Sequence, residues 1–459
     1  MDTSQESVII GQLQEQRDYF NKGTTKNLSE RIDALKRLKV SVKRHTEDIA
    51  SALWEDLHKS AYEAYLTETG IVLRELKMLI NNLKSWARTE NVSSPVFLWP
   101  SKSKIVKEPY GQVLILGPWN YPFQLIMIPL VSAIAAGNVV ALKLSVNAPK
   151  TAEIIDKIVS EVFNKEHVRC FHGEMEVSQF LLSQRFDYIF FTGSPRVGKI
   201  VMSAAANYLT PITLELGGKS PCIVDETADI KTAARRIVWG KLVNAGQTCI
   251  APDYLLVHKK VKKELLEYMV DYINQFYGEN PQDSVDYARI VSTSALDRLV
   301  NLIKGEEVYH GGISNRDSKY LSPTILDNVS DESPIMQEEI FGPILPVLTV
   351  DNIENAIQYV QRHEKPLALY FFGNPEKGKT VINQTSSGGA CINDTILHVA
   401  NSKLPFGGVG QSGMGSYHGK AGFETFTHRR SIIISKSWID FSIKFPPYKS
   451  LSLLKRLLN

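Results

Sequence analysis

The sequence predicts an α/β fold built on mainly parallel sheets. Short apolar runs rich in Val, Ile and Leu recur after residue 104, in GQVLILGPWN, PCIVD, YLLVH and PILPVLTV. Helix-like stretches such as APKTAEIIDKIVSEVF separate these runs, which is the pattern of βαβ units. The runs are continuously apolar, as expected for strands that are buried on both faces. A chain of 459 residues is long enough for two or three domains with large cores.

The residues before this region predict helices. In SERIDALKRLKVSVKRHTEDIASAL, apolar residues recur three and four positions apart, and either Asn27 or Ser29 can cap the start. The stretch NVSSPVFLWPSKSK (91–104) has two prolines and four serines and predicts a connector. The most apolar segment, Leu125–Ala136, has twelve residues and contains Pro129. It is too short to span a bilayer, so we expect a buried helix.

Composition narrows the classes of function. A net charge of +3 is too small to indicate a nucleic-acid partner. The four cysteines include no C-x-x-C pair, so we expect neither a disulfide framework nor a zinc site. The N-terminus, MDTSQESVIIGQLQEQRDYF, has no long apolar core and is not a secretory signal. Together with the sparse cysteines, this predicts a cytoplasmic protein.

One cysteine differs from the other three. Cys249 lies among small and polar residues in NAGQTCIAP, whereas Cys170, Cys222 and Cys391 each border an apolar, strand-like run. A free cysteine in such a run behaves as a small hydrophobic residue. Cys249 is therefore the candidate for chemistry, although a packed thiol is the commoner explanation of a lone cysteine.

A predicted strand-to-helix turn offers a phosphate site. In FDYIFFTGSPRVGKIVMSAAAN, an apolar strand over Tyr188–Phe191 leads into Gly193, and a helix begins near Val197. Gly193 and Gly198 allow close backbone approach, and free N–H groups at a helix start can hold a pyrophosphate. The match to the P-loop pattern is incomplete, because Ile200 stands where Ser or Thr would hold magnesium. The full G-x-G-x-x-G fingerprint is also absent, so a dinucleotide would bind on a variant turn.

Three polar residues near apolar strands are further candidates. Glu215 in LELGGKSP precedes two glycines, and we interpret it as an accessible, mobile carboxylate that can act as a general base. Asn120 in LGPWNYPF can donate a hydrogen bond to a developing oxyanion. Glu339 in MQEEIFGPILPV can accept both hydroxyls of a ribose, with Phe341 beside a nicotinamide. Each has an ordinary alternative: a solvated strand-end carboxylate, a turn asparagine and a surface glutamate pair.

Several motifs together carry a family resemblance. GPWNYP, FTGSPRVGK, LELGGKSP, NAGQTCIAP, EEIFGP and LPFGGVGQSGMGSYHG occur in this order along the chain, and in this combination they resemble the aldehyde dehydrogenase superfamily. The short N-terminus and the phrases DLHKS, RHEKPLALYFF, SSGGACIND and FETFTHRRS resemble its class 3, fatty aldehyde dehydrogenase-like branch. The resemblance covers nearly the whole chain.

The resemblance implies NAD(P)-dependent oxidation of a medium- or long-chain aliphatic or aromatic aldehyde to a carboxylic acid. Cys249 would be the nucleophile and would form a thiohemiacetal and then a thioester. Asn120 and the Cys249 backbone N–H would hold the oxyanion, and Glu215 would activate the hydrolytic water. No metal is implied. An acylating enzyme that passes the thioester to coenzyme A would not need Glu215, and a non-enzymatic scaffold would usually have lost one of these residues.

The same resemblance implies NAD, NADP or both as the cofactor. A lysine in ALKLS would bind the adenosine ribose, the glycine turn would hold the phosphates, and EEIFGP would hold the nicotinamide riboside. The matched residues are Lys143, Gly193, Ser194, Gly198, Glu339 and Phe341. One position departs from the family, which commonly has K-P-S-E where this chain has K-L-S-V, ending at Val146. Without that glutamate nothing repels a 2′-phosphate, so we expect the use of both NAD and NADP.

The family fold implies three parts, a homodimer and a tail. A Rossmann-like cofactor domain, an α/β catalytic domain and a small bridging sheet that pairs with a partner chain are expected. The cofactor domain would cover 1–88 and 108–213, and the catalytic domain 214–413. The bridging sheet would cover 89–107 and 426–437, and the tail 438–459.

The tail KFPPYKSLSLLKRLLN has two interpretations. An apolar stripe with flanking cations predicts peripheral contact with a membrane near the substrate entrance, and a plain packing helix is the alternative. The stripe and the cations comprise Leu451, Leu454, Leu458, Lys449, Lys455 and Arg456.

Overall fold

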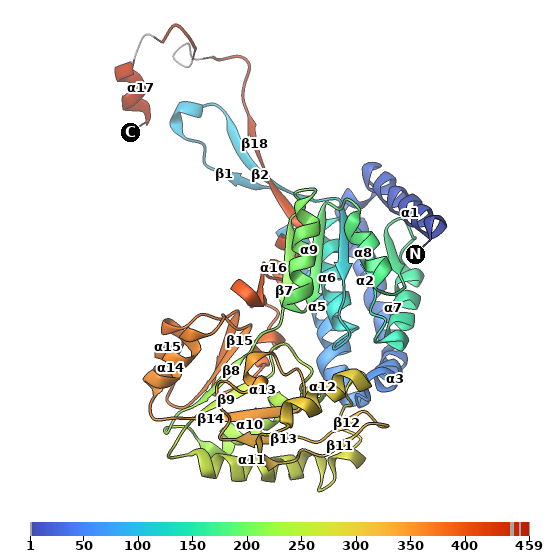
Figure 1. Cartoon of the computed structure of the whole chain (residues 1–459). Coiled ribbons are helices and arrows are strands. Elements are labelled where there is room, and N and C mark those ends of the chain that lie inside the picture. Colours follow the sequence, from blue (N-terminus) through green and yellow to red (C-terminus); the bar gives the residue numbers. More distant parts are fainter. Residues whose placement is uncertain (1, 441–444, 449–450, 459) are drawn as a thin grey trace.

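The computed structural model describes residues 2–440, 445–448 and 451–458. Figure 1 shows two α/β units, one above the other, and a narrow three-stranded sheet that projects away from both. The prediction of an α/β fold with mainly parallel sheets is confirmed.

The first unit is built on a six-stranded sheet with the order β17-β7-β6-β3-β4-β5. All neighbours are parallel except β17, which runs antiparallel at one edge. The strands are β3 (Gln112–Leu116), β4 (Val139–Lys143), β5 (Val168–Phe171), β6 (Tyr188–Gly193), β7 (Ile212–Leu216) and β17 (Gly413–Met414).

Helices pack around this sheet. The N-terminal helices are α1 (Thr3–Asn21), α2 (Leu28–Arg44), α3 (Thr46–Leu57), α4 (Ala61–Ala64) and α5 (Gly70–Trp86). The later ones are α6 (Gln124–Ala136), α7 (Pro149–Val162), α8 (Met175–Ser183), α9 (Pro195–Ala206) and α16 (Gly419–Thr425). Asn27 caps α2 by accepting a hydrogen bond from the Ser29 N–H, as expected. Every residue of α6 is buried, which confirms the predicted core helix.

The second unit contains a seven-stranded sheet with the order β10-β13-β14-β9-β8-β15-β16, in which β10 alone is antiparallel to its neighbour. The strands are β8 (Pro221–Val224), β9 (Tyr254–His258), β10 (Glu307–His310), β13 (Thr324–Asp327), β14 (Ile344–Val350), β15 (Ala368–Phe372) and β16 (Gly389–Ile392). The main helices are α10 (Ile230–Leu242), α11 (Lys262–Tyr277), α12 (Thr293–Ile303), α14 (Ile353–Arg362) and α15 (Pro375–Gln384). Cys170, Cys222 and Cys391 lie in β5, β8 and β16, as their apolar neighbours predict.

The chain passes between the two units twice. Strand β7 ends at Leu216 in the first sheet, and β8 begins at Pro221 in the second. The predicted boundary after residue 213 therefore falls inside β7. Near the other end, β17 pairs with β7 and α16 packs on α5 and α6. Residues 413–425 thus return to the first unit.

The projecting sheet has the order β1-β2-β18, with β1 (Glu90–Val92), β2 (Lys102–Pro109) and β18 (Thr427–Ile434) all antiparallel. The prediction of a plain connector over 91–104 is wrong, because this stretch contains the end of β1, a short 3-10 helix (Val96–Leu98) and the start of β2. Strand β18 supplies the backbone partners for β2 from more than 300 residues further along the chain, with Lys102 opposite Ile434. A local reading of the composition cannot detect such a partner.

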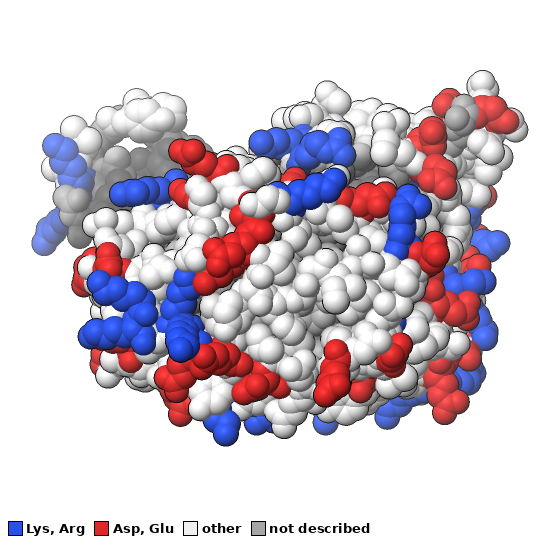
Figure 2. Space-filling view, turned by 60° about the horizontal axis from the view of Figure 1, so that its bottom comes forward, with Lys and Arg blue, Asp and Glu red and all other residues white. Residues whose placement is uncertain are grey.

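The tail forms a helix, α17 (Leu451–Leu458), near the tip of the projecting sheet. Leu451 and Leu454 are exposed, and Trp99 and Trp438 meet edge to face with 6.3 Å between ring centroids. Lys449 and the side chain of Leu458 lie outside the described residues. In the described ranges, none of the helices combines the length and the apolar character needed to cross a membrane. Figure 2 shows charges of both signs around the periphery of one face and few charges at its centre.

Candidate active site

Cys249 lies in a strained loop between α10 and β9. Three consecutive residues before it are left-handed: Asn244 (φ 55°), Ala245 (φ 50°) and Gly246 (φ 74°). A Cβ atom on Gly246 would overlap the backbone carbonyl of Gly342, so only glycine lets these two backbones approach. Strain of this kind persists when the surroundings over-determine the conformation.

Gln247 is the main support of this loop. Its side-chain amide is fully buried and donates from Nε2 to the carbonyls of Asn244 (3.0 Å) and Arg289 (2.9 Å). Its Oε1 accepts from the Val291 N–H at 2.9 Å. The Gln247 side chain therefore links two parts of the loop to each other and to the segment before α12. These hydrogen bonds hold Cys249, two residues later, in place.

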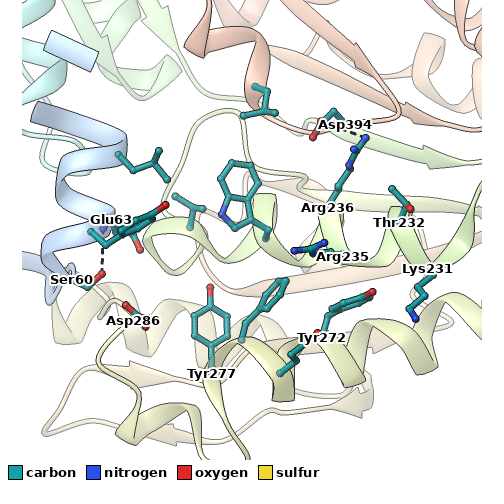
Figure 3. A pocket seen from close by; sticks show the side chains of 17 residues that line it. Ser60, Glu63, Lys231, Thr232, Arg235, Arg236, Tyr272, Tyr277, Asp286 and Asp394 are labelled. Atoms are coloured by element: carbon teal, nitrogen blue, oxygen red, sulfur yellow. Dashed lines mark hydrogen bonds and ion pairs between the residues drawn. The ribbon is translucent and has the colours of Figure 1, made fainter. Parts of the chain in front are cut away.

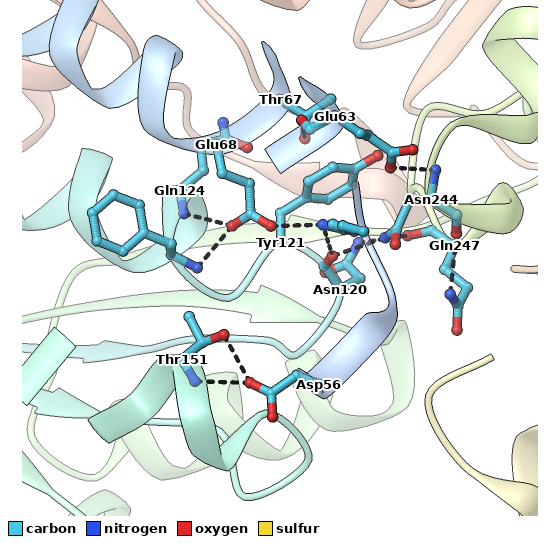
Figure 4. A network of polar contacts seen from close by, with 12 residues as sticks. Asp56, Glu63, Thr67, Glu68, Asn120, Tyr121, Gln124, Thr151, Asn244 and Gln247 are labelled. Atoms are coloured by element: carbon cyan, nitrogen blue, oxygen red, sulfur yellow. Dashed lines mark hydrogen bonds and ion pairs between the residues drawn. The ribbon is translucent and has the colours of Figure 1, made fainter. Parts of the chain in front are cut away.

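Asn120 reaches the same loop from the first unit (Figure 4). It follows β3, is buried, and donates from Nδ2 to the Gln247 carbonyl at 3.0 Å. A primary amide has two N–H groups, and this bond uses one of them. The Asn120 backbone carbonyl accepts from Lys59 Nζ and from Asn244 Nδ2, both at 2.8 Å. Asn120 is thus held on both sides and belongs to the surroundings of Cys249.

A buried ion pair lies behind Asn120. The Lys59 ammonium and the Glu68 carboxylate are 2.6 Å apart, and both side chains are 0% exposed. Glu68 also accepts from the backbone N–H groups of Phe123 (2.9 Å) and Gln124 (3.1 Å). The sequence analysis did not identify this pair. The only available signal was that Lys59 stands within DLHKS.

The surroundings of Cys249 shift the pKa of its thiol in both directions. Burial raises this pKa well above the usual value, and the neighbouring carboxyl groups of Glu339 and Glu215 raise it further when they are ionised. The backbone N–H groups of Cys249 and Ile250 donate to the sulfur and lower its pKa by less. The thiol is therefore protonated at neutral pH in this state, and hydrogen-bond donors already point at the sulfur.

Glu215 is not the accessible, mobile carboxylate that the sequence predicts. It lies in β7, is 3% exposed, and neither carboxylate oxygen has a hydrogen-bond partner within the described residues. Burial raises its pKa well above the usual value and so favours the neutral carboxyl. The Glu215 backbone pairs with Gly413 of β17 at the edge of the sheet.

Glu339 lies against the glycines that follow β7. A Cβ atom on Gly217 would overlap the Glu339 carboxylate, so the absent side chain makes the space that the carboxylate fills. The Gly218 N–H donates to this carboxylate and lowers its pKa, but burial and the charge of Asp253 raise it to about 8. Phe341, two residues on, has a left-handed backbone (φ 52°).

The predicted phosphate turn begins α9 at the carboxyl end of β6. Ser194 caps the helix and Pro195 is its first residue, two positions before the predicted start. A Cβ atom on Gly198 would lie 2.7 Å from a methyl of Leu216, so this glycine lets α9 pack closely on β7. Beside the turn, the buried Thr192 hydroxyl has no partner among the described residues. Gly193 ends β6 directly before the Ser194 cap of α9.

Lys143 ends the neighbouring strand β4. It is 5% exposed, and its ammonium donates to the Leu144 carbonyl at 2.8 Å, a single partner for three N–H groups in the described part of the chain. Burial lowers its pKa, and the charge of Glu174 opposes that shift. Val146 follows in the same loop and is exposed. The parallel strands β3, β4, β6 and β7 thus bring Asn120, Lys143, Gly193 and Glu215 to the same edge of the sheet, at the carboxyl ends of the strands. Ligands of α/β proteins bind at this edge.

An apolar cavity of about 110 Å³ lies beside Cys249. The Tyr121 and Thr248 hydroxyls form a 2.6 Å hydrogen bond at its wall. The other lining residues are mainly apolar and include Leu125, Trp239, Val243, Ile396, Phe406 and Tyr417. They come from six separate segments, so no local pattern could have identified them. The described residues contain no group of three or more His, Cys, Asp or Glu side chains arranged for a metal ion.

Comparisons with known proteins agree with this geometry. The model of the aldehyde dehydrogenase family matches residues 7–432. The 4,4′-diaponeurosporen-aldehyde dehydrogenase of Staphylococcus aureus is 48% identical over 446 residues, which cover 96% of this chain and 97% of that relative. The dimeric NADP-preferring aldehyde dehydrogenase of Canis lupus familiaris is 44% identical over 444 residues, with 96% and 98% covered.

Solved structures give the same result. A structure described as the substrate-bound state of Staphylococcus aureus AldH superposes with a TM-score of 0.96 at 47% identity, covering 98% of this chain and 99% of that chain. A family model over nearly the whole length, relatives above 40% identity and a shared fold all concur. This chain belongs to the aldehyde dehydrogenase family and is an oxidoreductase that acts on aldehydes.

Proposed function

We propose that this protein oxidises aldehydes with an apolar body, medium- or long-chain aliphatic or aromatic, to carboxylic acids with NAD or NADP. The observation that carries the proposal is the position of the Cys249 thiol, between an apolar cavity on one side and Glu215 and Glu339 on the other. The cavity suits the body of an apolar aldehyde. The name of one relative, a 4,4′-diaponeurosporen-aldehyde dehydrogenase, supports this substrate class.

The chemistry begins with loss of the Cys249 thiol proton to solvent and attack of the sulfur on the aldehyde carbon, which forms a C–S bond and turns the carbonyl oxygen into the oxyanion of a thiohemiacetal. The free N–H of the Asn120 amide and the Cys249 backbone N–H stabilise the oxyanion, and one such donor contributes about 3 kcal/mol. When bound, NAD(P) supplies the hydride acceptor that turns the thiohemiacetal into a thioester.

Hydrolysis of the thioester requires a base. Burial raises the pKa of Glu215 and favours its protonated form, so the group must be ionised before it can take a proton from the attacking water. A carboxylate with a raised pKa is a stronger base than an ordinary one, which suits the deprotonation of water. Release of the acid restores the Cys249 thiol.

The residues at the sheet edge fit a dinucleotide. The Lys143 ammonium has N–H groups to spare for ribose hydroxyls, and the Thr192 hydroxyl lacks a partner in the described residues. Gly193, Ser194 and the start of α9 suit the phosphates, and Glu339 with Phe341 suits the nicotinamide riboside. Gly198 acts indirectly, because it lets α9 pack closely on β7.

Val146 bears on the choice of cofactor. It is exposed beside Lys143 and has no charge to repel a 2′-phosphate, so both NAD and NADP should bind. A relative named as NADP-preferring supports this expectation.

The proposed assembly is a homodimer. Each chain has three parts, which are the cofactor domain, the catalytic domain and the bridging sheet. The outer edge of β18 pairs with no strand of the described residues, and such an edge can pair with a partner chain. The name of a relative, a dimeric enzyme, supports this. Peripheral contact of the tail with a membrane remains a proposal that the exposed Leu451 and Leu454 support.

Two variants test the reaction. Purified protein should reduce NAD or NADP in the presence of a medium-chain aldehyde, and Cys249→Ala should abolish this absorbance change. Glu215→Gln should still produce one burst of reduced cofactor per chain, followed by accumulation of an acylated Cys249 that mass spectrometry detects. Steady turnover by Glu215→Gln without coenzyme A would refute the hydrolytic role, and turnover by Cys249→Ala would refute the nucleophile.

A further inference from the structure

A second pocket adjoins the cavity beside Cys249. It has a volume of about 1200 Å³ and lies between α4, α10 and α11 (Figure 3). The pocket and the cavity share four lining residues, Leu66, Trp239, Val243 and Leu397. A substrate whose aldehyde reaches Cys249 and whose body exceeds the small cavity therefore extends into this outer pocket.

Helix α10 forms one wall of both spaces. Lys231, Arg235 and Trp239 are four residues apart on one face, and Val243 follows in the same row. At 1.5 Å per residue, each step advances about 6 Å along the helix. Val243 and Trp239 line the inner cavity, whereas Arg235 and Lys231 line only the outer pocket. The wall thus changes from apolar to cationic within about 12 Å.

Arg235 is the cation best placed to bind a ligand. It is exposed to the pocket and has neither a hydrogen bond nor an ion pair within the described residues. Its neighbour Arg236 is engaged by Asp394 at 3.5 Å and by the Asn393 carbonyl. Figure 3 shows the Arg235 side chain at the pocket that Tyr272 and Tyr277 also line. A free guanidinium beside aromatic rings suits a planar anion.

The opposite wall of the outer pocket carries carboxyl groups, which cannot bind an anion in place of Arg235. Asp286 is exposed there, and Glu63 accepts the Asn244 N–H at 2.8 Å. Burial raises the pKa of Glu63 to about 7, so its negative charge is reduced at neutral pH. The free cations are therefore gathered on the α10 wall, in line with the mouth of the inner cavity.

We propose that the preferred substrates carry an anionic group at the end remote from the aldehyde, joined to it by an apolar body, and that Arg235 recognises this group. This inference rests on the proposed aldehyde oxidation and adds the chemical class of the substrate. Arg235 acts on specificity, because it lies outside the set of groups that surround the Cys249 sulfur.

Matched substrates test the proposal. A series of ω-oxo carboxylic acids from six to twelve carbons is compared with the corresponding methyl esters and with n-alkanals, as kcat/KM. The longer ω-oxo acids should exceed their esters about tenfold, as a charge-assisted hydrogen bond predicts. Arg235→Gln should abolish this preference and leave kcat/KM for alkanals unchanged, and Arg235→Lys should keep part of it. Arg362→Gln is the control, because Arg362 is an exposed helical arginine outside the pocket.

A binding measurement separates the two proposals. Calorimetry with ω-hydroxy carboxylic acids, which cannot be oxidised as aldehydes, should give weaker binding for Arg235→Gln than for the parent protein and for Arg362→Gln. If no aldehyde is oxidised but this difference persists, the proposed function fails and the anion site stands. Equal kcat/KM for acid and ester, or a preference that survives in Arg235→Gln, overturns the anion site while aldehyde oxidation stands.

Discussion

Replacing Lys59 with Met should damage both the stability and the activity of the enzyme. The side chains of Lys59 and Glu68 are 0% exposed and 2.6 Å apart, so the change leaves a buried carboxylate without its counter-ion. Loss of one partner of a buried ion pair costs about 3–5 kcal/mol. Two backbone N–H groups, of Phe123 and Gln124, still donate to Glu68. We therefore expect the lower end, about 3 kcal/mol of unfolding free energy.

The activity should fall for a related reason. Lys59 Nζ donates to the Asn120 backbone carbonyl at 2.8 Å, and Asn120 in turn donates to the Cys249 loop through Gln247. Without this anchor the amide is less well oriented toward the oxyanion, a contribution that exists only in the transition state. The expected signature is a lower kcat with little change in KM.

Urea unfolding and steady-state kinetics test this reasoning. Adding Glu68→Gln to Lys59→Met removes the orphan charge and keeps an acceptor for both N–H groups, so the double variant should be more stable than the single one. Lys36→Met is the control, since Lys36 pairs with Asp33 at the surface, and it should cost less than about 1 kcal/mol. A cost for Lys59→Met no greater than this control, or a double variant no more stable than the single one, would refute the account.

Three further predictions follow from the same site. Burial raises the pKa of Glu215, so its basic form grows as pH rises; the rate of thioester hydrolysis should increase with pH over a range higher than that of an ordinary glutamate, and a flat profile from stopped-flow measurements would count against Glu215 as the base. Gly246→Ala should destabilise the protein by more than about 1 kcal/mol, because φ is 74° and the new Cβ would overlap the Gly342 carbonyl; an unchanged melting curve would contradict the strained loop. Val146→Glu should weaken NADP binding about tenfold or more through charge repulsion and spare NAD, as fluorescence titration would show; equal effects on both cofactors would argue against contact with the 2′-phosphate.

The sequence by itself determined the fold class and singled out Cys249 as the candidate nucleophile. Continuous apolar runs predict buried strands, and the all-apolar segment 125–136 predicts a core helix that is fully buried. These features depend on neighbours in the chain, so a linear pattern records them. Cys249 was identifiable because its small neighbours differ from the apolar surroundings of the other three cysteines.

The tertiary structure decided the environment of each group. Glu215 looked like an exposed carboxylate, but the assembled fold buries its side chain and thereby raises its pKa. The stretch 91–104 looked like a connector, but β18 turns part of it into a sheet. The contact of Lys59 with the Asn120 carbonyl and the outer pocket that Arg235 lines likewise depend on distant segments meeting. Local periodicity dictates which elements form, whereas burial and charge pairing arise between elements, so only the assembled fold determines them.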